Sequence, residues 1–292
     1  MTLLTRETES TTEPETPAEA LPITIIRPPR GWIALNLKEL WQYRELLLFL
    51  AWRDVSVRYK QTALGAAWAI IQPFVAMVIF SVVFGELAKI PSDDVPYPLF
   101  SYAALLPWQF FATALSSAAS SLVNDEKLIT KIYFPRLIIP VASVLPAAID
   151  FLIAFVILLG MMLFYHTLPT WRIVWLPLFL LLAAVTALGV GLWLAAFNVQ
   201  YRDFRYVIPF LLQVWMYASP VVYSSTIIPE RWRLLFGINP MTGVIGGFRW
   251  ALLGTETAPG PLMLISAATA LVFLIVGAFY FRRMESSFAD VI

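Results

Sequence analysis

Six apolar stretches dominate this 292-residue sequence, and they limit the folds that the chain can adopt. Each stretch approaches or exceeds the ~20 residues that a helix needs to cross a hydrocarbon layer about 30 Å thick. In lipid, only helices and closed barrels satisfy their own backbone hydrogen bonds, and apolar runs of this length are typical of helices. The predicted spans are residues 63–87, 99–123, 137–164, 173–198, 206–223 and 261–281.

The composition also favours a chain that crosses the membrane several times. The residues are 60% hydrophobic and 13% charged, whereas soluble domains are about a quarter charged. The mean hydropathy is +0.76, so most of the length prefers hydrocarbon to water. We therefore predict an all-α integral membrane protein with six transmembrane helices, an N-terminal amphipathic interface helix, and a re-entrant segment between the fifth and sixth spans.

Charge and residue types exclude two classes of function. Lys and Arg number 20 and Asp and Glu number 19, whereas nucleic-acid binding needs a concentrated basic patch. The chain has no cysteine, and His166 is its single histidine, so thiolate and imidazole metal clusters are excluded. His166 falls in a short loop between two predicted spans, and we assign it no role.

The two ends of the chain differ in composition. Residues 1–30 hold few apolar side chains and are rich in Thr, Ser, Pro and Glu, which predicts a disordered acidic tail. Residues 31–292 form the predicted membrane domain. The first long apolar run begins only near Ala63, too late for a cleaved secretory leader.

Residues 36–60 predict one amphipathic helix. Its apolar positions recur every three or four residues, with charged residues between them: Leu37, Leu40, Trp41, Leu48, Trp52, Val55 and Tyr59. This spacing is typical of a helical stripe. Tryptophans on one side and basic residues on the other suit a helix that lies flat in the headgroup layer. The alternative is an amphipathic helix packed on a soluble domain.

Residues 241–253 are apolar but too short to cross the membrane. Gly243, Gly246 and Gly247 interrupt the run. A re-entrant or interfacial segment fits best, and such backbone must be buried in protein or line a wet cavity. We therefore predict that it lies at the outer end of a pathway. The alternative is an extracytoplasmic loop with a buried turn.

The distribution of Lys and Arg predicts the orientation. One side of the membrane would hold Arg44, Arg53, Arg58, Lys60, Lys127, Lys131, Arg136, Arg202, Arg205, Arg282 and Arg283. The other side would hold Lys89, Arg172, Arg231, Arg233 and Arg249. Cytoplasmic loops carry the excess of Lys and Arg, so both termini are predicted to be cytoplasmic.

Residues 124–136 are the most structured of the predicted polar connections. Asn124 is a suitable cap, Asp125 and Glu126 suit the first turn of a helix, and Pro135 biases the residue before it away from helix. A cytoplasmic helix of about two turns is predicted. Its apolar residues share one side: Leu128, Ile129 and Ile132. They either bind a partner protein or pack back on the membrane domain.

Asp150 is the acidic residue most clearly inside a predicted span. An acid at this depth is costly, so a functional role is the first interpretation. The alternative is a buried hydrogen bond to a Tyr, a Ser or a backbone group of a neighbouring helix.

Several of these segments resemble the ABC-2-type exporter permeases. The first is Arg53-Asp54-Val55-Ser56-Val57-Arg58-Tyr59-Lys60-Gln61-Thr62, followed by Leu64-Gly65, Trp68 and Gln72-Pro73. The others are Asn124, Leu128-Ile129, Lys131 and Phe134-Pro135-Arg136, then Tyr201-Arg202-Asp203, Ser219-Pro220-Val221 with Tyr223, and Asn239-Pro240 with Arg249. The resemblance runs from about Leu37 to Met284. It is strongest to the polysaccharide branch, whose members move O-antigen, teichoic acid or capsular chains out of bacteria.

The resemblance implies a half-transporter of the bacterial inner membrane. Two copies would form the pathway, and two copies of a separate ATPase would drive export of a lipid-linked polysaccharide. The sequence has no Gly-x-x-x-x-Gly-Lys-[Ser/Thr] loop, so it cannot cradle ATP phosphates in that manner. This chain would therefore bind no cofactor and catalyse no reaction, and ATP and Mg²⁺ would be bound by the partner ATPase.

The resemblance also assigns roles to residues. The ATPase would dock on the segment that holds Asn124, Lys127, Leu128, Ile129, Lys131, Ile132, Phe134, Pro135 and Arg136. A lipid-linked glycan carries a pyrophosphate, for which Arg53, Arg58 and Lys60 are candidates. The alternative for these cations is attraction to anionic lipid.

Aromatic residues make up 15% of the chain, and their faces suit a sugar chain that must slide without fixed hydrogen bonds. The candidates for a corridor are Trp108, Phe110, Phe111, Trp215 and Tyr217. The alternative for each is lipid contact or helix packing.

Three other functions were weighed. An ABC-2 exporter of drugs or lipids would use the same fold, although the Phe134-Pro135-Arg136 and Ser219-Pro220-Val221 motifs favour the polysaccharide branch. An enzyme acting on a lipid carrier would need converging carboxylates or histidines, which the sequence does not predict. A passive channel is disfavoured because rings of charge or carbonyl filters are not evident.

Overall fold

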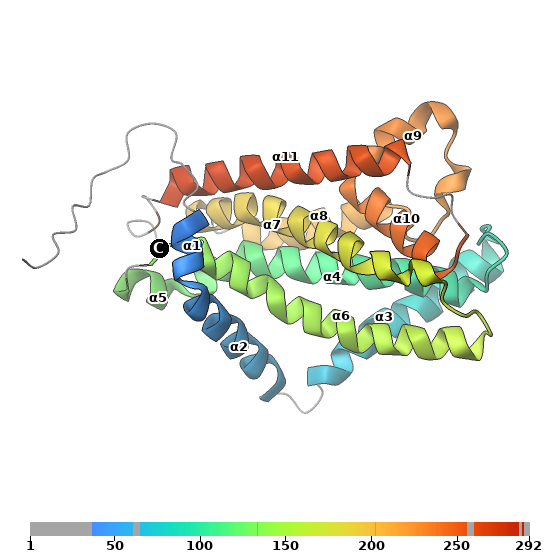
Figure 1. Ribbon diagram of the computed structural model, residues 1–292, viewed down its shortest axis with the longest axis horizontal. Helices are drawn as coiled ribbons and strands as arrows, with labels where there is room; N and C mark the ends of the chain where they lie inside the picture. Colours follow the sequence, from blue (N-terminus) through green and yellow to red (C-terminus); the bar gives the residue numbers. More distant parts are fainter. Residues whose placement is uncertain are drawn as a thin grey trace, which may run out of the picture. The chain divides into compact units, whose positions relative to one another are not determined.

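A computed structural model describes residues 37–60, 65–132, 134–201, 203–255, 260–285 and 288. Every regular element within these ranges is a helix, which confirms the predicted all-α class. The bounds are α1 Leu37–Gln42, α2 Arg44–Lys60, α3 Gly65–Phe80, η1 Ser81–Leu87, α4 Tyr97–Asn124, α5 Glu126–Lys131, α6 Ile138–Phe164, η2 Trp171–Trp175, α7 Leu176–Gln200, α8 Phe204–Tyr217, η3 Ser225–Ile227, α9 Glu230–Gly237, α10 Pro240–Leu252 and α11 Pro261–Met284 (Figure 1). The predicted tail at residues 1–30 lies outside the described residues, as do Asn36, Gln61, Thr62, Ala63, Leu64, Tyr133 and Arg202.

Four helical segments of the described residues are long and apolar enough to cross a membrane. They are Ala67–Leu87, Ile138–Phe164, Trp171–Gln200 and Pro261–Met284, at the places of four of the six predicted spans. α4 has 28 residues but is less apolar, since it also holds Gln109, Asn124 and several serines. α8 has 14 residues and ends at Tyr217, before the predicted end of the fifth span at residue 223.

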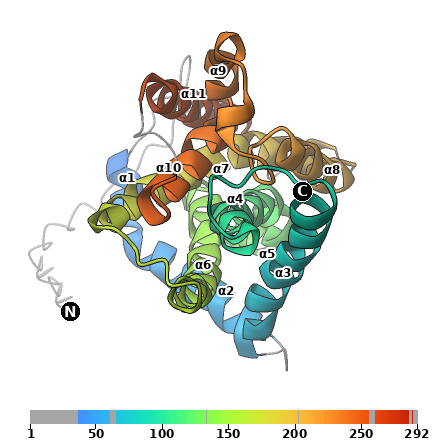
Figure 2. The same ribbon diagram turned by 90° about the vertical axis from the view of Figure 1, so that its right-hand side faces the viewer.

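α4 is the central helix of this arrangement. Figure 2 shows it surrounded by α3, α6, α7 and α10, all of which contact it. Its alanines and serines allow close approach; for example, a Cβ on Gly191 of α7 would lie only 2.8 Å from the Ala118 Cβ. Large side chains such as Phe100, Tyr102 and Phe111 fill the remaining space and are fully buried. Apolar burial and close packing therefore hold the core around one helix.

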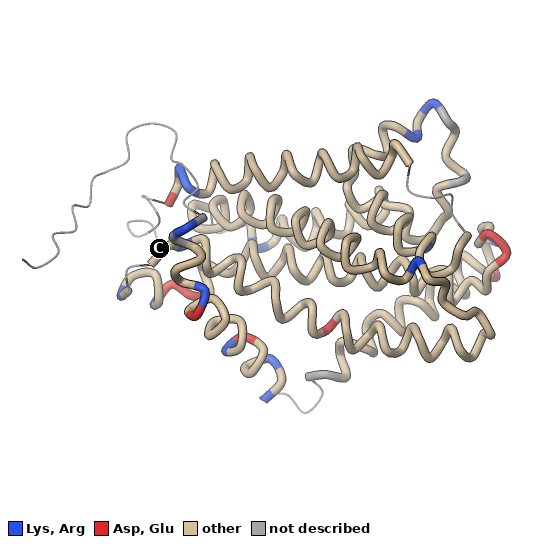
Figure 3. Tube along the Cα trace, viewed as in Figure 1, with Lys and Arg blue, Asp and Glu red and all other residues tan. Residues whose placement is uncertain are grey.

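A second hydrophobic cluster lies at the same end of the long helices as α5. It joins residues from α2, α5, α6, α7 and α11 and includes Leu50, Ile129, Phe134, Phe281 and Phe288. Charged residues gather at the two ends of the long helices and are sparse along α4, α6, α7 and α11 (Figure 3). This distribution suits helices whose middle parts lie in hydrocarbon.

The predicted helix at residues 36–60 is two helices, α1 and α2, with a turn at Tyr43. α2 runs obliquely across α6 (Figure 1) and packs on it through Leu50 and Ala51. Its exposed apolar face is separate from this contact and consists of Leu48, Phe49 and Trp52, with Trp41 of α1. α2 therefore has one face for the protein and a second apolar face that remains exposed, rather than the single apolar stripe that was predicted.

The predicted re-entrant segment, residues 241–253, lies in α10, which is a continuous helix from Pro240 to Leu252 and is almost fully buried. The Asn239 side chain caps it by accepting a hydrogen bond from the Met241 amide at 3.1 Å. The glycines instead allow close contacts. A Cβ on Gly243 would lie 2.6 Å from the Ser266 Cβ, and one on Gly247 would lie 2.7 Å from the Phe179 ring.

Candidate functional site

The predicted coupling segment forms a shorter helix than expected. α4 continues through Asn124, so this residue does not cap α5, and Asp125 occupies the position before the helix. α5 then spans six residues, and Ile132 is extended. The sequence pattern predicted a cap at Asn124, but only one residue, Asp125, separates the two helices. Asn124 is therefore the last residue of α4.

The segment has an inward and an outward side. Ile129 is 5% exposed and packs in the cluster with Leu50 and Phe134, and Leu128 packs against that cluster. Ile132 is 59% exposed, and Lys127 and Lys131 are exposed as well. Leu128 and Ile129 therefore pack on the membrane domain, which is one of the two interpretations. Ile132 lies on the surface, where the other interpretation, a partner protein, stays open.

Ion pairs and hydrogen bonds fasten the segment at both ends. Asp125 Oδ2 lies 2.9 Å from Arg53 Nη2 of α2, and the same guanidinium lies 2.8 Å from Asp54 Oδ1. At the other end, the Arg136 amide donates to Glu285 Oε1 at 3.1 Å, and the Arg136 guanidinium donates to the Glu285 carbonyl. Residues 125–136 are thus joined to α2 and to the end of α11.

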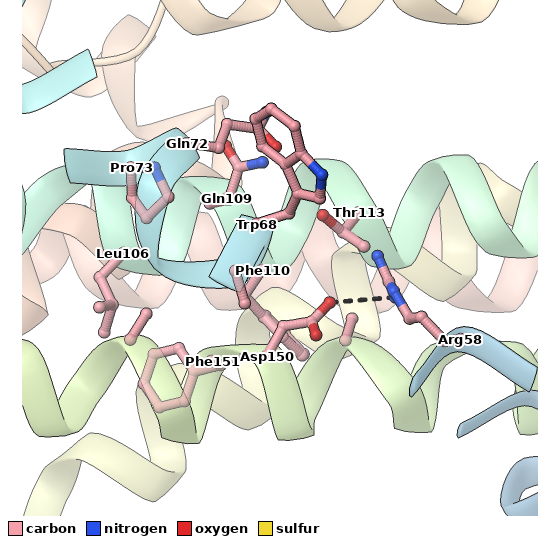
Figure 4. Close-up of a pocket in the computed structure, with 13 residues that line it drawn as sticks. Arg58, Trp68, Gln72, Pro73, Leu106, Gln109, Phe110, Thr113, Asp150 and Phe151 are labelled. Carbon is pink, nitrogen blue, oxygen red and sulfur yellow. Dashed lines mark ion pairs between the residues drawn. The ribbon is translucent and has the colours of Figure 1, made fainter. Parts of the chain in front are cut away.

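A second site joins α2 to α6 around Asp150. Arg58 Nη1 lies 3.0 Å from Asp150 Oδ2, and the Tyr59 hydroxyl donates to Asp150 Oδ1 at 2.5 Å. Figure 4 shows the carboxylate pointing toward the guanidinium, with both groups at the edge of a small cavity. Burial, and then the hydrogen bond to Asp150, raises the pKa of the Tyr59 phenol far above its ordinary value. The phenol therefore keeps its proton at neutral pH and remains a donor.

Two of the three pyrophosphate candidates form ion pairs with carboxylates of this chain. Arg53 contacts Asp54 and Asp125, and its hydrogen bond to Asp125 raises the pKa of the guanidinium. Arg58 contacts Asp150, and Lys60 is exposed at the end of α2. A phosphate at either arginine would share the guanidinium with an acid, and the role of these residues in headgroup binding stays a prediction.

We expect Asp150→Asn and Asp150→Leu to differ. The asparagine oxygen still accepts from Tyr59, so the free energy of unfolding should fall by less than about 1 kcal/mol. Leucine removes the acceptor for both Tyr59 and Arg58, and a loss of about 2 kcal/mol is expected. Chemical unfolding in detergent and the yield of assembled complex measure this difference. Equal values for the two variants would show that the hydrogen bond is dispensable.

A polar stripe on α4 was missed by the sequence analysis. Gln109, Thr113, Ser117, Ser120 and Asn124 recur every three or four residues and lie on the face of α4 that is not buried by the core. Gln109 and Thr113 line the cavity of about 80 Å³ beside Asp150, and the others line a groove of about 410 Å³ that reaches Arg53. The spacing itself was the available signal, since one helical face repeats at this interval.

The corridor candidates lie in two different environments. Trp108, Phe110 and Phe111 are buried in the core, and the Phe111 ring packs edge to face on Trp215 with centroids 5.0 Å apart. Tyr217 is exposed on α8. In the single chain, the first three residues contact other helices, so their role in a corridor stays a prediction.

Arg249 was counted among the outer cations, but the structure places it inside the protein at 0% exposure. Its guanidinium donates to the carbonyls of Pro220, Val221 and Tyr223 at 2.8–2.9 Å and lies 3.6 Å from the centroid of the Phe100 ring. These carbonyls follow the end of α8, where the backbone no longer satisfies them. Arg249 therefore stabilises the turns that end α8.

Asn239 provides a second connection at this end of the helices. Its amide oxygen accepts from Trp215 Nε1 at 2.9 Å, and its amide nitrogen donates to Ser219 Oγ at 2.9 Å. The Ser266 hydroxyl of α11 donates to the Gly237 carbonyl at 3.0 Å. Side-chain hydrogen bonds thus link α8 to the beginning of α10, and α11 to the end of α9, around the predicted re-entrant region.

Known proteins are similar to this sequence over most of its length. Residues 45–253 match the family described as ABC-2 type transporter. The chain is 31% identical over 261 residues to the O-antigen export system permease protein RfbA of Myxococcus xanthus, covering 88% of this chain and 98% of the relative. It is 25% identical over 249 residues to the protein of that name in Klebsiella pneumoniae, covering 85% and 95%. It is 22% identical over 254 residues to the polysialic acid transport protein KpsM of Escherichia coli, covering 82% and 93%.

Proposed function

Because this chain belongs to the ABC-2 type transporter family, we propose that it is the membrane subunit of an ATP-driven exporter of lipid-linked polysaccharide such as O-antigen. The observation that carries the proposal is the similarity to O-antigen export permeases over 98% and 95% of their lengths. The all-helical fold, with four helical segments long and apolar enough to span a membrane, supports it. α4 and α8 complete the proposed set of six spans, with both termini in the cytoplasm.

ATP is hydrolysed in a separate subunit that docks on residues 124–136. Support comes from the exposed Ile132, which directly follows the short helix α5 and its exposed Lys127 and Lys131. An exposed apolar side chain within a polar rim is typical of a protein interface. The bonds of Asp125 to Arg53 and of Arg136 to Glu285 give this helix mechanical contact with α2 and α11.

Two copies of the chain form the pathway. α8 carries an exposed apolar stripe at intervals of three or four residues, made of Tyr206, Phe210, Val214 and Tyr217. α3 and η1 expose a similar stripe, made of Ile71, Val75, Ile79 and Val83. Exposed apolar faces of this extent mark contacts with lipid or protein, and a second copy is the occupant that also closes a corridor between the two subunits.

The transport cycle then follows from differential binding of ATP. ATP favours the closed form of the paired ATPases, which moves the two α5 helices and shifts the membrane subunits toward the open form. Arg53 transmits this motion to α2, and Glu285 transmits it to α11. The exposed apolar face of α2 keeps that helix in the headgroup layer, where it moves as a lever beside the entrance of the corridor.

We expect the chain, purified with its ATPase and placed in vesicles, to deliver a lipid-linked glycan across the bilayer only when ATP is supplied. The measurement is protection of the glycan from an added glycosidase after transfer to the lumen. Vesicles with the chain but without the ATPase are the control and should show no delivery. An isolated chain that hydrolyses ATP, or a complex that moves drugs or phospholipids but no glycan, would contradict the proposal.

A further inference from the structure

Two polar hollows follow one another along the polar face of α4. The groove of about 410 Å³ includes Asn124, at the end of α4 next to α5, and is also lined by Ser117 and Ser120. The cavity of about 80 Å³ lies farther along the same helix, at Thr113 and Gln109. Thr113 precedes Ser117 by four residues, so about one helical turn of α4 separates the residues that line the two hollows.

α6, which packs on α4, shows the same order. Ser143 and Pro146 line the groove, and Ala147 and Asp150 line the cavity. Among the described residues, Arg58 of α2 is the only one that lines both hollows. Figure 4 shows its side chain reaching the edge of the cavity from α2, with an ion pair to Asp150. The Arg58 side chain therefore lies at the boundary between the groove and the cavity.

The cavity has the size and the chemistry to hold water. A buried water needs roughly 10–15 Å³ of cavity volume and two to four polar partners. This cavity, at about 80 Å³, is several times larger, and the polar residues around it include Gln72, Gln109, Thr113 and Asp150. Water at this place also lowers the cost of keeping a carboxylate ionised among apolar helices.

The contact that closes the boundary is one that can open. Arg58 Nη1 lies 3.0 Å from Asp150 Oδ2, and the Arg58 side chain is 40% exposed. An ion pair with a partly exposed partner contributes little to stability, because water can replace the contact. Asp150 also accepts a hydrogen bond from the Tyr59 hydroxyl at 2.5 Å. The carboxylate therefore keeps one partner when the guanidinium turns away.

We propose that the Arg58 side chain is a gate between the groove and a water-filled cavity at Asp150. When it pairs with Asp150, it blocks the way from the groove to the cavity, and its positive charge repels cations. When the guanidinium turns into the groove, small solutes reach the middle of α4 and α6. The inference goes beyond the proposed function, because it concerns the access of water and small ions within one chain rather than the passage of a glycan between two copies.

The chain has no cysteine, so single cysteines can report access at chosen positions. Ser117→Cys reports the groove, and Thr113→Cys, one turn away on the same face of α4, reports the cavity. Leu152→Cys is the matched control, since Leu152 is 59% exposed on α6, two residues from Asp150, and lines neither hollow. The full chain is placed in lipid nanodiscs, where both faces of the bilayer are open, and treated with a small anionic methanethiosulfonate. Mass spectrometry of the intact chain measures the rate of modification.

With Arg58 in place, Ser117→Cys should react about tenfold faster than Thr113→Cys, and Leu152→Cys, in hydrocarbon, should not react. Arg58→Ala should raise the rate at Thr113→Cys by about tenfold. Loss of a positive charge by itself slows an anionic reagent, so a faster reaction reports an opened path. Asp150→Asn, which keeps Arg58 but weakens its contact, should give a smaller rise. Arg58→Lys, which keeps the charge, should stay near the parent.

Equal rates at Thr113→Cys with and without Arg58→Ala would overturn the inference. So would a parent background in which Thr113→Cys reacts as fast as Ser117→Cys. A rise that Leu152→Cys shares would show that the helices have loosened, and it would contradict a gate at Arg58 as well. None of these outcomes depends on which substrate the complex exports.

Discussion

Gly277→Ala is expected to destabilise the protein more than its small change in size suggests. α7 and α11 cross with their backbones in contact, and a Cβ on Gly277 would lie 2.1 Å from the Gly189 carbonyl oxygen. A backbone atom of a packed helix cannot rotate away as a flexible side chain can, so the two helices must separate. We expect a loss of about 3 kcal/mol in the free energy of unfolding, and we expect Gly277→Leu to prevent accumulation of folded protein.

Gly160→Ala is the matched control, because Gly160 also lies within a long apolar helix and an added Cβ there meets nothing within 4 Å. Alanine restricts the unfolded chain, so this variant should be as stable as the parent or up to about 1 kcal/mol more stable. Unfolding in detergent and the monodisperse yield from membranes are the measurements. Equal stability of the two alanine variants would mean that α7 and α11 are farther apart than the structure has them.

The positions of the long helices follow from the sequence because apolar length is a local property. Residues 137–164 and 261–281 were predicted as spans from composition alone, and α6 and α11 occupy them. The end of α8 is different. Its helix stops at Tyr217, and the carbonyls that follow are bound by Arg249, which is more than 25 residues away in the chain. A local pattern does not reveal such a partner, so the length of α8 and the burial of Arg249 were both missed.

The candidate sites, too, were only partly predictable from local sequence patterns. The sequence marked Asp150 as an unusual acid in an apolar run, but its partners Arg58 and Tyr59 come from a helix about 90 residues earlier. Likewise, the apolar side of residues 124–136 was evident, whereas the division between the buried Ile129 and the exposed Ile132 depends on where α2 and α11 pack. Residue types were therefore predictable, and the long-range pairings that give them a role were not.

The exposed position of Ile132 makes it the residue of choice for testing ATPase docking. Ile129 is 5% exposed and part of the core cluster, so an aspartate there would disturb the fold and the interface together. Ile132 is 59% exposed, and Ile132→Asp should change the free energy of unfolding of the isolated chain by less than about 0.5 kcal/mol. A loss of function in this variant can therefore be assigned to a missing contact with the partner.

In the complex, Ile132→Asp should greatly weaken ATPase binding. A buried apolar contact at the centre of an interface contributes about 2 kcal/mol or more, which corresponds to a roughly 30-fold loss of affinity. Co-purification of the ATPase and ATP-dependent delivery of glycan should fall together. Leu168→Asp is the matched control, since Leu168 is 72% exposed and lies in the connection between α6 and η2, at the opposite end of α6 from α5. If the ATPase docks at α5, Ile132→Asp should lose ATPase binding and Leu168→Asp should bind the ATPase as the parent does. The reverse result would place the ATPase on the other side of the membrane domain.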